Sequence, residues 1–142
     1  MTYAIDTNII YDICTADDEF GPRSRDFLAK LHVNGDNLIA CDVVWAEASA
    51  GFPDKEAFAR QMADFGIAFS PMPESAAILA GSIWKRARTT LAKAKKPRLS
   101  IIPDFLIGAH ALECADALVT RDRGFTRTWF AELRTIDPMK AS

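Results

Sequence analysis

Four acidic residues stand at the predicted ends of strands or early in predicted helices, although they are far apart in the sequence. They are Asp6, Glu47, Asp104 and Asp122. Carboxylates that gather in one place repel one another and raise each other's pKa values unless a cation holds them. Hard divalent cations such as Mg²⁺ prefer this oxygen-rich ligand set, which contains neither Cys nor His. The four acids therefore predict a metal site wherever the fold brings them together.

Two neutral polar residues accompany these acids. Asn8 follows Asp6 closely and adds an amide oxygen, while Thr120 adds a hydroxyl close to Asp122. A site with two cations about 3.5–4 Å apart would activate water and stabilise the leaving oxygen of a phosphodiester. Such chemistry requires neither a catalytic His nor a Ser nucleophile.

Each acid also has an ordinary structural explanation. An Asp at the start of a helix accepts hydrogen bonds from free backbone N–H groups and interacts favourably with the helix dipole. Capping alone would explain Asp6 or Asp104. Glu47 is harder to explain in this way, because the segment 43–50 is otherwise poor in charge and a lone acid there needs a partner or a function.

Short apolar runs alternate with helical patterns along the chain. Runs at 2–5, 37–41, 67–69, 117–120 and 133–136 predict buried parallel strands, which read as continuous apolar stretches. Helices are predicted at 23–32, at 43–50 after an Asp42 N-cap, and at 55–65, 74–93 and 103–113. Pro97 is expected to end the region of the longest helix. The alternation predicts an α/β sandwich around a mostly parallel central sheet.

This architecture predicts where the four acids lie. In a parallel α/β sheet the carboxyl ends of the strands and the amino ends of the helices share one edge, and ligands bind there. Asp6 and Asp122 follow predicted strands, whereas Glu47 and Asp104 lie early in predicted helices. All four acids are therefore expected at this one edge of the sheet.

The size and composition are those of an ordinary globular protein. With 142 residues, 49% hydrophobic and 25% charged, the chain is expected to form one domain over residues 1–142. No apolar run approaches the ~20 residues of a membrane span, and Met1-Thr2-Tyr3 lacks the basic start of a signal peptide. Three widely spaced cysteines without a CxxC pair suit reduced thiols. We therefore expect a cytoplasmic protein without a membrane span.

The residues around the acids resemble the PIN domain, and most closely the VapC-like toxins of type II toxin–antitoxin pairs. The resemblance rests on Tyr3-Ala4-Ile5-Asp6-Thr7-Asn8, on Trp45-Ala46-Glu47, on the segment PDFLIGAHAL from Pro103, and on ALVTRDRGF from Ala117. It covers essentially the full chain. The three residues DTN alone are common, but their combination with the two longer motifs is specific.

The resemblance implies a three-layer α/β/α PIN-like fold with about five strands. It also implies an endoribonuclease that depends on Mg²⁺ or Mn²⁺, is inhibited by a small antitoxin protein, and is usually a homodimer. By matching positions, the acidic quartet would be Asp6, Glu47, Asp104 and Asp122, with Asn8 and Thr120 in supporting polar positions. The block around Glu47 is the least distinctive part of the match.

Basic residues offer candidate contacts for RNA phosphates. The net charge is only −2, but seven basic residues and no acid lie at 85–98: Lys85, Arg86, Arg88, Lys93, Lys95, Lys96 and Arg98. This stretch either binds a polyanion or forms a solvated helix face followed by a turn. Arg121 and Arg123 flank Asp122 and pose the same choice between phosphate contacts and surface arginines in a loop.

Two alternatives to an active nuclease follow from the same residues. A receiver-like signalling domain also gathers acids at the carboxyl edge of a parallel sheet, but Asp6 is followed by Thr7 rather than by a second acid. A catalytically inactive PIN scaffold would bind only RNA or a protein, although a pure binder has no reason to keep four mutually repelling carboxylates. The histidines, His32 and His110, are interpreted as structural or surface residues.

Overall fold

The computed structural model describes residues 1–95 and 102–141, and only the backbone of Arg123. Lys96, Pro97 and Arg98, part of the basic stretch and its predicted helix end, lie outside the described residues, as does the side chain of Arg123. The elements in chain order are β1 (Thr2–Ile5), α1 (Thr7–Cys14), α2 (Gly21–Val33), β2 (Asn37–Cys41), α3 (Asp42–Ser49), α4 (Lys55–Phe65), β3 (Ile67–Ser70), α5 (Glu74–Lys93), α6 (Ile102–Cys114), β4 (Ala117–Val119), α7 (Arg123–Trp129) and β5 (Thr135–Ile136).

The five strands form one sheet in the order β3-β2-β1-β4-β5, and each neighbouring pair is parallel. This confirms the predicted parallel sheet. The order also rules out the receiver-like alternative, because sheets of that kind run 2-1-3-4-5. With β1 in the centre, the chain first builds the sheet outward to β3 and then crosses over to build β4 and β5 on the other side.

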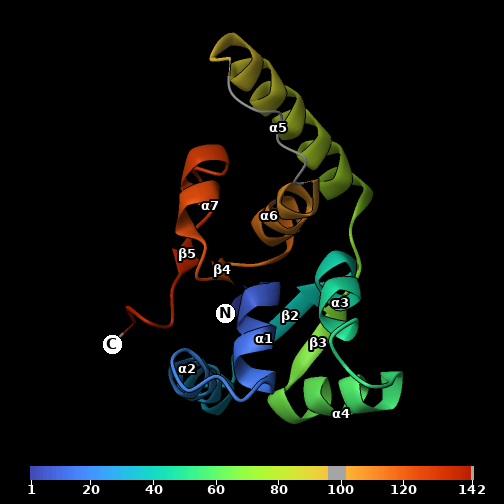
Figure 1. Ribbon diagram of the computed structural model, residues 1–142, viewed down its shortest axis with the longest axis vertical. Coiled ribbons are helices and arrows are strands. Elements are labelled where there is room, and N and C mark those ends of the chain that lie inside the picture. The colour runs from blue at the N-terminus through green and yellow to red at the C-terminus, as the bar shows by residue number, and fades with distance from the viewer. Residues whose placement is uncertain (96–101, 142) are drawn as a thin grey trace.

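Helices cover both faces of the sheet, which gives the predicted three layers (Figure 1). Right-handed crossovers place α1–α4 on one face and α5–α7 on the other, since the two halves of the sheet are built in opposite directions. Helix α6 contacts β1 and β4, and α5 packs on α6 while extending away from the strands (Figure 1). Among the described residues, no helix has the length and apolar character needed to cross a bilayer.

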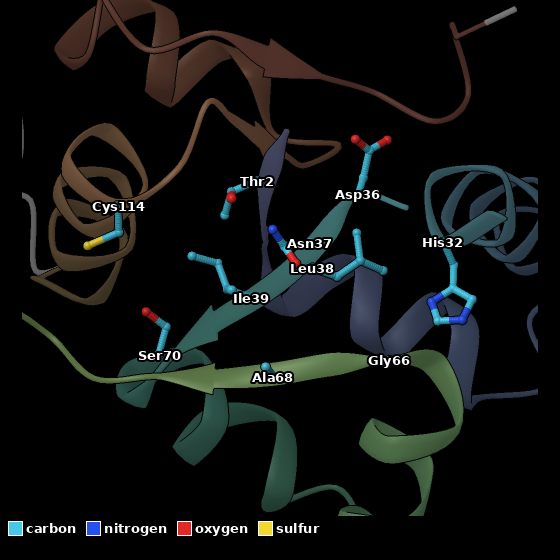
Figure 2. Close-up of a pocket in the computed structure, with 10 residues that line it drawn as sticks. All are labelled: Thr2, His32, Asp36, Asn37, Leu38, Ile39, Gly66, Ala68, Ser70 and Cys114. Carbon is cyan, nitrogen blue, oxygen red and sulfur yellow. The ribbon is translucent and has the colours of Figure 1, made fainter. Parts of the chain in front are cut away.

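The second face is covered only in part, and the uncovered area forms a pocket of about 490 Å³ over β2 and β3 (Figure 2). We call it the sheet-face pocket. Asn37 and Ala68 are exposed there because α6 lies over β1 and β4, in the other part of the sheet. The residues that line it are Thr2, His32, Asp36, Asn37, Leu38, Ile39, Gly66, Ala68, Ser70 and Cys114.

The core lies on the central strands and holds the ends of the elements in place. Ile5, Leu118 and Val119 are at most 1% exposed, and burial of each such aliphatic side chain contributes roughly 1.5–3 kcal/mol. Phe105 of α6 contacts Phe125 of α7 with ring centroids 4.9 Å apart. Since Asp104 precedes Phe105 and Asp122 precedes α7, this contact fixes two predicted site residues relative to each other.

Most predicted elements are present, and the differences lie at their ends. The helices at 55–65 and 74–93 and the strands at 2–5 and 37–41 have the predicted bounds. The last strand is shorter than predicted, and the strand at 117–120 stops at Val119, leaving Thr120 in the following loop. Asp42 is not an N-cap: β2 runs directly into α3, so Cys41 occupies that position and Asp42 is the first helical residue. Helices α1 and α7 were not among the predicted ranges.

Candidate active site at the carboxyl edge of the sheet

Asp6 joins the two central strands and starts a helix. Its backbone N–H donates to the carbonyl of Val119 at 3.0 Å, which continues the pairing of β1 with β4. One side-chain oxygen, Oδ1, accepts from the N–H of Thr7 at 2.7 Å, so Asp6 is the N-cap of α1. The other oxygen, Oδ2, accepts from the hydroxyl of Thr120 at 2.7 Å. The capping interpretation of Asp6 is therefore correct for its backbone and one oxygen.

Thr120 and Asn8, predicted as supporting residues, both approach Oδ2 of this carboxylate. Thr120 is fully buried, and its Oγ1 accepts from Asn8 Nδ2 at 3.3 Å and from the N–H of Asp122 at 3.0 Å. Asn8 Nδ2 also lies 3.5 Å from Asp6 Oδ2. The start of α1 and the loop after β4 thus share one hydrogen-bond network centred on Asp6.

Glu47 reaches the same edge from α3. Its Oε1 accepts from the hydroxyl of Thr7 at 2.9 Å, and its backbone carbonyl accepts from the phenol of Tyr11 at 2.7 Å. The side chain of Glu47 is otherwise exposed, whereas Thr7 is 8% exposed. Thr7 therefore links Glu47 to Asp6, a role that sequence reasoning missed. Its place inside the DTN triplet was the only available signal.

Asp104 and Asp122 come from the second half of the chain. Asp104 lies in the first turn of α6 and is partly buried. Asp122 is the N-cap of α7, where its Oδ1 accepts from the N–H of Phe125 at 3.4 Å, and its side chain is exposed.

The four acids influence one another electrostatically. The pKa of Asp104 is raised to about 6, first by burial and then by the charges of Asp6, Asp122 and Glu47, in that order. The pKa of Asp6 is also raised, mainly by burial and additionally by Glu47 and Asp122, against the hydrogen bonds from Thr120 and Thr7. Only charges that lie near one another have such effects. These effects agree with the hydrogen bonds that link Asp6 to Glu47 through Thr7 and to Asp122 through Thr120.

The donor set suits a hard divalent cation, because it consists of carboxylate oxygens with an amide and hydroxyls beside them. Within the part of the chain that the structure describes, however, no three acidic, His or Cys side chains are arranged so that they could hold a metal ion. The oxygens of Asp6 and the Oε1 of Glu47 face hydroxyl and N–H donors instead. Coordination would require some of these side chains to turn away from their present partners.

Arg121 does not have the free guanidinium of a phosphate contact. Its Nε and Nη2 donate to the two carboxylate oxygens of Asp12 at 2.7 and 3.0 Å, and its guanidinium lies 4.0 Å from the centre of the Phe20 ring. The hydrogen bonds from Arg121 satisfy Asp12, which is only 3% exposed. Arg121 therefore has a structural role in an ion pair, which neither of the two predicted alternatives for this residue included.

The basic residues of α5 differ from one another. Arg86 is exposed, as the predicted contacts require. Arg88 is partly buried, and its guanidinium lies 4.1 Å from the centre of the Trp84 ring. Arg88 is thus committed in part to packing on its own helix.

His110 is buried and His32 is exposed, in line with the structural and surface roles predicted for the histidines. His110 is 1% exposed and its Nε2 lies 3.0 Å from the hydroxyl of Ser70, while burial lowers its pKa. His32 lines the sheet-face pocket together with Asp36 at the end opposite Ser70 and Cys114 (Figure 2).

Comparisons with known proteins agree with this arrangement. The family model described as PIN domain matches residues 3–130. The fold is similar to a chain in the crystal structure of VapBC2 from Rickettsia felis bound to a DNA fragment from its promoter, with 23% identity and a TM-score of 0.67 over 96% of this chain and 98% of that chain. A chain in DNA-bound VapBC from Salmonella typhimurium is 21% identical with a TM-score of 0.64, over 97% of this chain and 98% of that one. A chain in a toxin–antitoxin complex from Klebsiella pneumoniae is 16% identical with a TM-score of 0.59, over 96% and 97%. No curated protein sequence matches.

Proposed function

Because the chain belongs to the PIN domain family, we propose that it is an endoribonuclease that hydrolyses RNA phosphodiester bonds with the help of a divalent cation. The observation that carries the proposal is the hydrogen-bond network that joins Asp6 to Thr120 and, through Thr7, to the neighbourhood of Glu47. Beside it, burial and the charges of the other three acids raise the pKa of Asp104 to about 6. Carboxylates that lie close together destabilise a folded protein unless a bound cation neutralises their charges. Perturbed pKa values of this kind are typical of functional sites.

Asp6, Glu47, Asp104 and Asp122 would hold Mg²⁺ or Mn²⁺. The bound cation would supply a water activated for attack and neutralise charge on the leaving oxygen. Thr120 holds Asp6 in place through its short hydrogen bond, and Asn8 supports both residues. Thr7 holds Glu47 toward Asp6 and would release its carboxylate when the cation binds. The exposed side chain of Arg86 would contact the RNA backbone.

We further propose that this nuclease is the toxin of a type II toxin–antitoxin pair, a cytoplasmic homodimer that a cognate antitoxin protein inhibits. Support comes from the motifs of the sequence and from the fold, which is similar to chains found in VapBC and toxin–antitoxin complexes. These relatives share less than a quarter of their residues with this chain, so the partner and the assembly are part of the proposal.

The experiment that tests the nuclease is cleavage of total RNA by the wild-type protein and by Asp6→Asn, with a divalent cation and with EDTA. We expect cation-dependent cleavage by the wild type and at least ~100-fold less by Asp6→Asn, because the variant loses a charged ligand. Asp64→Asn, an exposed acid on α4, is the matched control and should cleave normally. A well-folded Asp6→Asn protein with undiminished cation-dependent cleavage would contradict the proposal.

A catalytically inactive PIN scaffold is the second candidate. It is favoured by one observation, the lack among the described residues of three side chains already arranged around a cation. Thermal melting with Mn²⁺ and with EDTA separates the two candidates, because a ligand that binds only the folded protein raises its melting temperature. If Mn²⁺ does not change the melting temperature of the wild type, the protein is the inactive scaffold. If Mn²⁺ raises it and Asp6→Asn removes this increase, the result supports the nuclease.

A further inference from the structure

Arg121 lies in the loop after β4, between two residues of the acidic edge, by which we mean the carboxyl edge of the sheet with its four acids. Thr120 on one side donates its hydroxyl to Asp6 at 2.7 Å, and Asp122 on the other side starts α7. The side chain of Arg121 forms a two-pronged ion pair with Asp12 of α1, at 2.7 and 3.0 Å. Arg121 therefore connects the loop that carries Thr120 and Asp122 to the helix that Asp6 begins.

Asp12 is held in place by its surroundings and can therefore anchor Arg121. It is 3% exposed, and Ser24 of α2 places its hydroxyl 3.4 Å from Oδ2. Helices α1 and α2 approach closely here, since a Cβ atom on Gly21 would lie 2.8 Å from the carbonyl oxygen of Asp12. A carboxylate buried in this way needs an opposite charge. Arg121 supplies it and is further held by the ring of Phe20 at 4.0 Å.

The backbone of Arg121 makes a second connection at the start of α1. Its N–H lies 3.4 Å from Asn8 Oδ1, and Asn8 in turn contacts Thr120 and Asp6 through Nδ2. The loop is thus attached to α1 at two levels, near its first turn through Asn8 and farther along through Asp12. Two such attachments fix both the position and the orientation of the loop relative to Asp6.

We propose that Arg121 is a positioning residue, which together with Asp12 holds Thr120 and Asp122 against Asp6 so that the acidic edge can bind a divalent cation. Arg121 acts through the loop and touches neither RNA nor the cation. The inference rests on the proposed nuclease function. A positioning residue of this kind controls the affinity for the cation, whereas a phosphate contact controls the affinity for RNA.

The test compares Arg121→Lys with Arg127→Lys, an exposed arginine of α7 that serves as the matched control. Lysine keeps the charge but loses the two-pronged geometry. Three quantities are measured: Mn²⁺ affinity from the electron paramagnetic resonance signal of free Mn²⁺, RNA affinity in EDTA at several salt concentrations, and the Mn²⁺ concentration for half-maximal cleavage.

For Arg121→Lys we expect Mn²⁺ affinity to fall about 10-fold or more, as for residues that orient metal ligands. Cleavage should recover at high Mn²⁺, and the salt dependence of RNA binding should stay that of the wild type. Arg127→Lys should change none of these. Unchanged Mn²⁺ affinity overturns the inference, and so does a loss confined to RNA affinity in EDTA, the result expected of a phosphate contact.

A double variant keeps the test usable if Arg121→Lys does not fold. Asp12→Asn combined with Arg121→Gln removes both charges, so that no buried carboxylate is left without a partner. It should show the same loss of Mn²⁺ affinity. If wild-type protein binds Mn²⁺ and cleaves RNA while both Arg121 variants match it, only the positioning role fails. A wild type that neither binds Mn²⁺ nor cleaves overturns the nuclease and this inference together.

Discussion

The carboxyl edge of the sheet and the sheet-face pocket (Figure 2) differ in how their charged groups are arranged. At the edge, Asp104 lies near three other acids, and their charges add to burial in raising its pKa to about 6. In the pocket the one acid of the lining is Asp36, whose Oδ1 lies 2.9 Å from the amino terminus of Met1. One region therefore gathers like charges, and the other pairs opposite ones.

This difference is more informative than the size of the pocket. The sheet-face pocket measures about 490 Å³, but it exists because α6 covers β1 and β4 and leaves β2 and β3 open on that face. Its ion pair needs no explanation beyond ordinary surface electrostatics. Four acids near one another work against folding, so their arrangement requires a use outside stability. If the gathered charges mark the functional site, substitutions at the carboxyl edge should affect cleavage more than substitutions in the sheet-face pocket.

Asp104→Asn should have the largest effect. The raised pKa means that the folded protein binds this proton more tightly than the unfolded chain, whose Asp has a pKa of 3.8. Stability of the metal-free wild type should therefore fall as the pH rises from about 4 through about 6, as Asp104 is forced to ionise. Asp104→Asn should melt higher than wild type at neutral pH in EDTA, yet cleave RNA at least ~100-fold more slowly.

The measurement is the melting temperature in EDTA and in Mn²⁺ at about pH 5 and about pH 7.5, beside the cleavage rate. Mn²⁺ should remove most of the loss of stability at the higher pH for the wild type and have little effect on Asp104→Asn. Cleavage by the wild type should rise as the pH passes about 6, because the ligand must be ionised. A metal-free wild type that becomes more stable over this pH range would show that Asp104 is not held among like charges.

Thr120→Val should have an intermediate effect. The substitution keeps the shape of the side chain but removes the 2.7 Å hydrogen bond to Asp6 and leaves the N–H of Asp122 without its acceptor. A hydrogen bond to a charged group contributes about 1.5–3 kcal/mol, so cleavage should fall by roughly 10- to 100-fold. Thr120→Ser keeps the hydroxyl and should stay close to wild type. Equal rates for the Val and Ser variants would mean that the network around Asp6 does not support the reaction.

The sequence was sufficient to predict the sheet and the place of the acids, because both depend on local patterns. Buried parallel strands read as apolar runs, as at Thr2–Ile5, and α5 repeats its apolar residues at helical spacing. The edge rule then places residues that follow strands or open helices together. None of these steps needs the position of a side chain.

Helices α1 and α7 are too short for an apolar pattern to repeat. Helix α1 (TNIIYDIC) has eight residues, and α7 (RGFTRTW) has seven and contains Gly and Thr, which are weak helix formers. Their starts depend on the capping side chains of Asp6 and Asp122.

The partners within the site could not be predicted for a different reason. Thr7 meets Glu47, which is 40 positions away, and Arg121 meets Asp12, which is 109 positions away. A flanking arginine next to a proposed catalytic acid suggested an RNA contact. Only the packing of α1 on α2, which buries Asp12, shows that this arginine serves the protein itself.

Asn37→Ala should have the smallest effect and completes the comparison. Asn37 is exposed in the sheet-face pocket, at the amino end of β2 and thus at the opposite end of the strand from the acids. Removing its amide should change cleavage and the Mn²⁺-induced shift in melting temperature less than about twofold, since surface substitutions usually have small effects. Both are measured beside Thr120→Val in one preparation series. If Asn37→Ala lost cleavage about as strongly as Thr120→Val while it kept its fold, the pocket would take part in the reaction, and pocket size rather than gathered charge would be the better guide to function here.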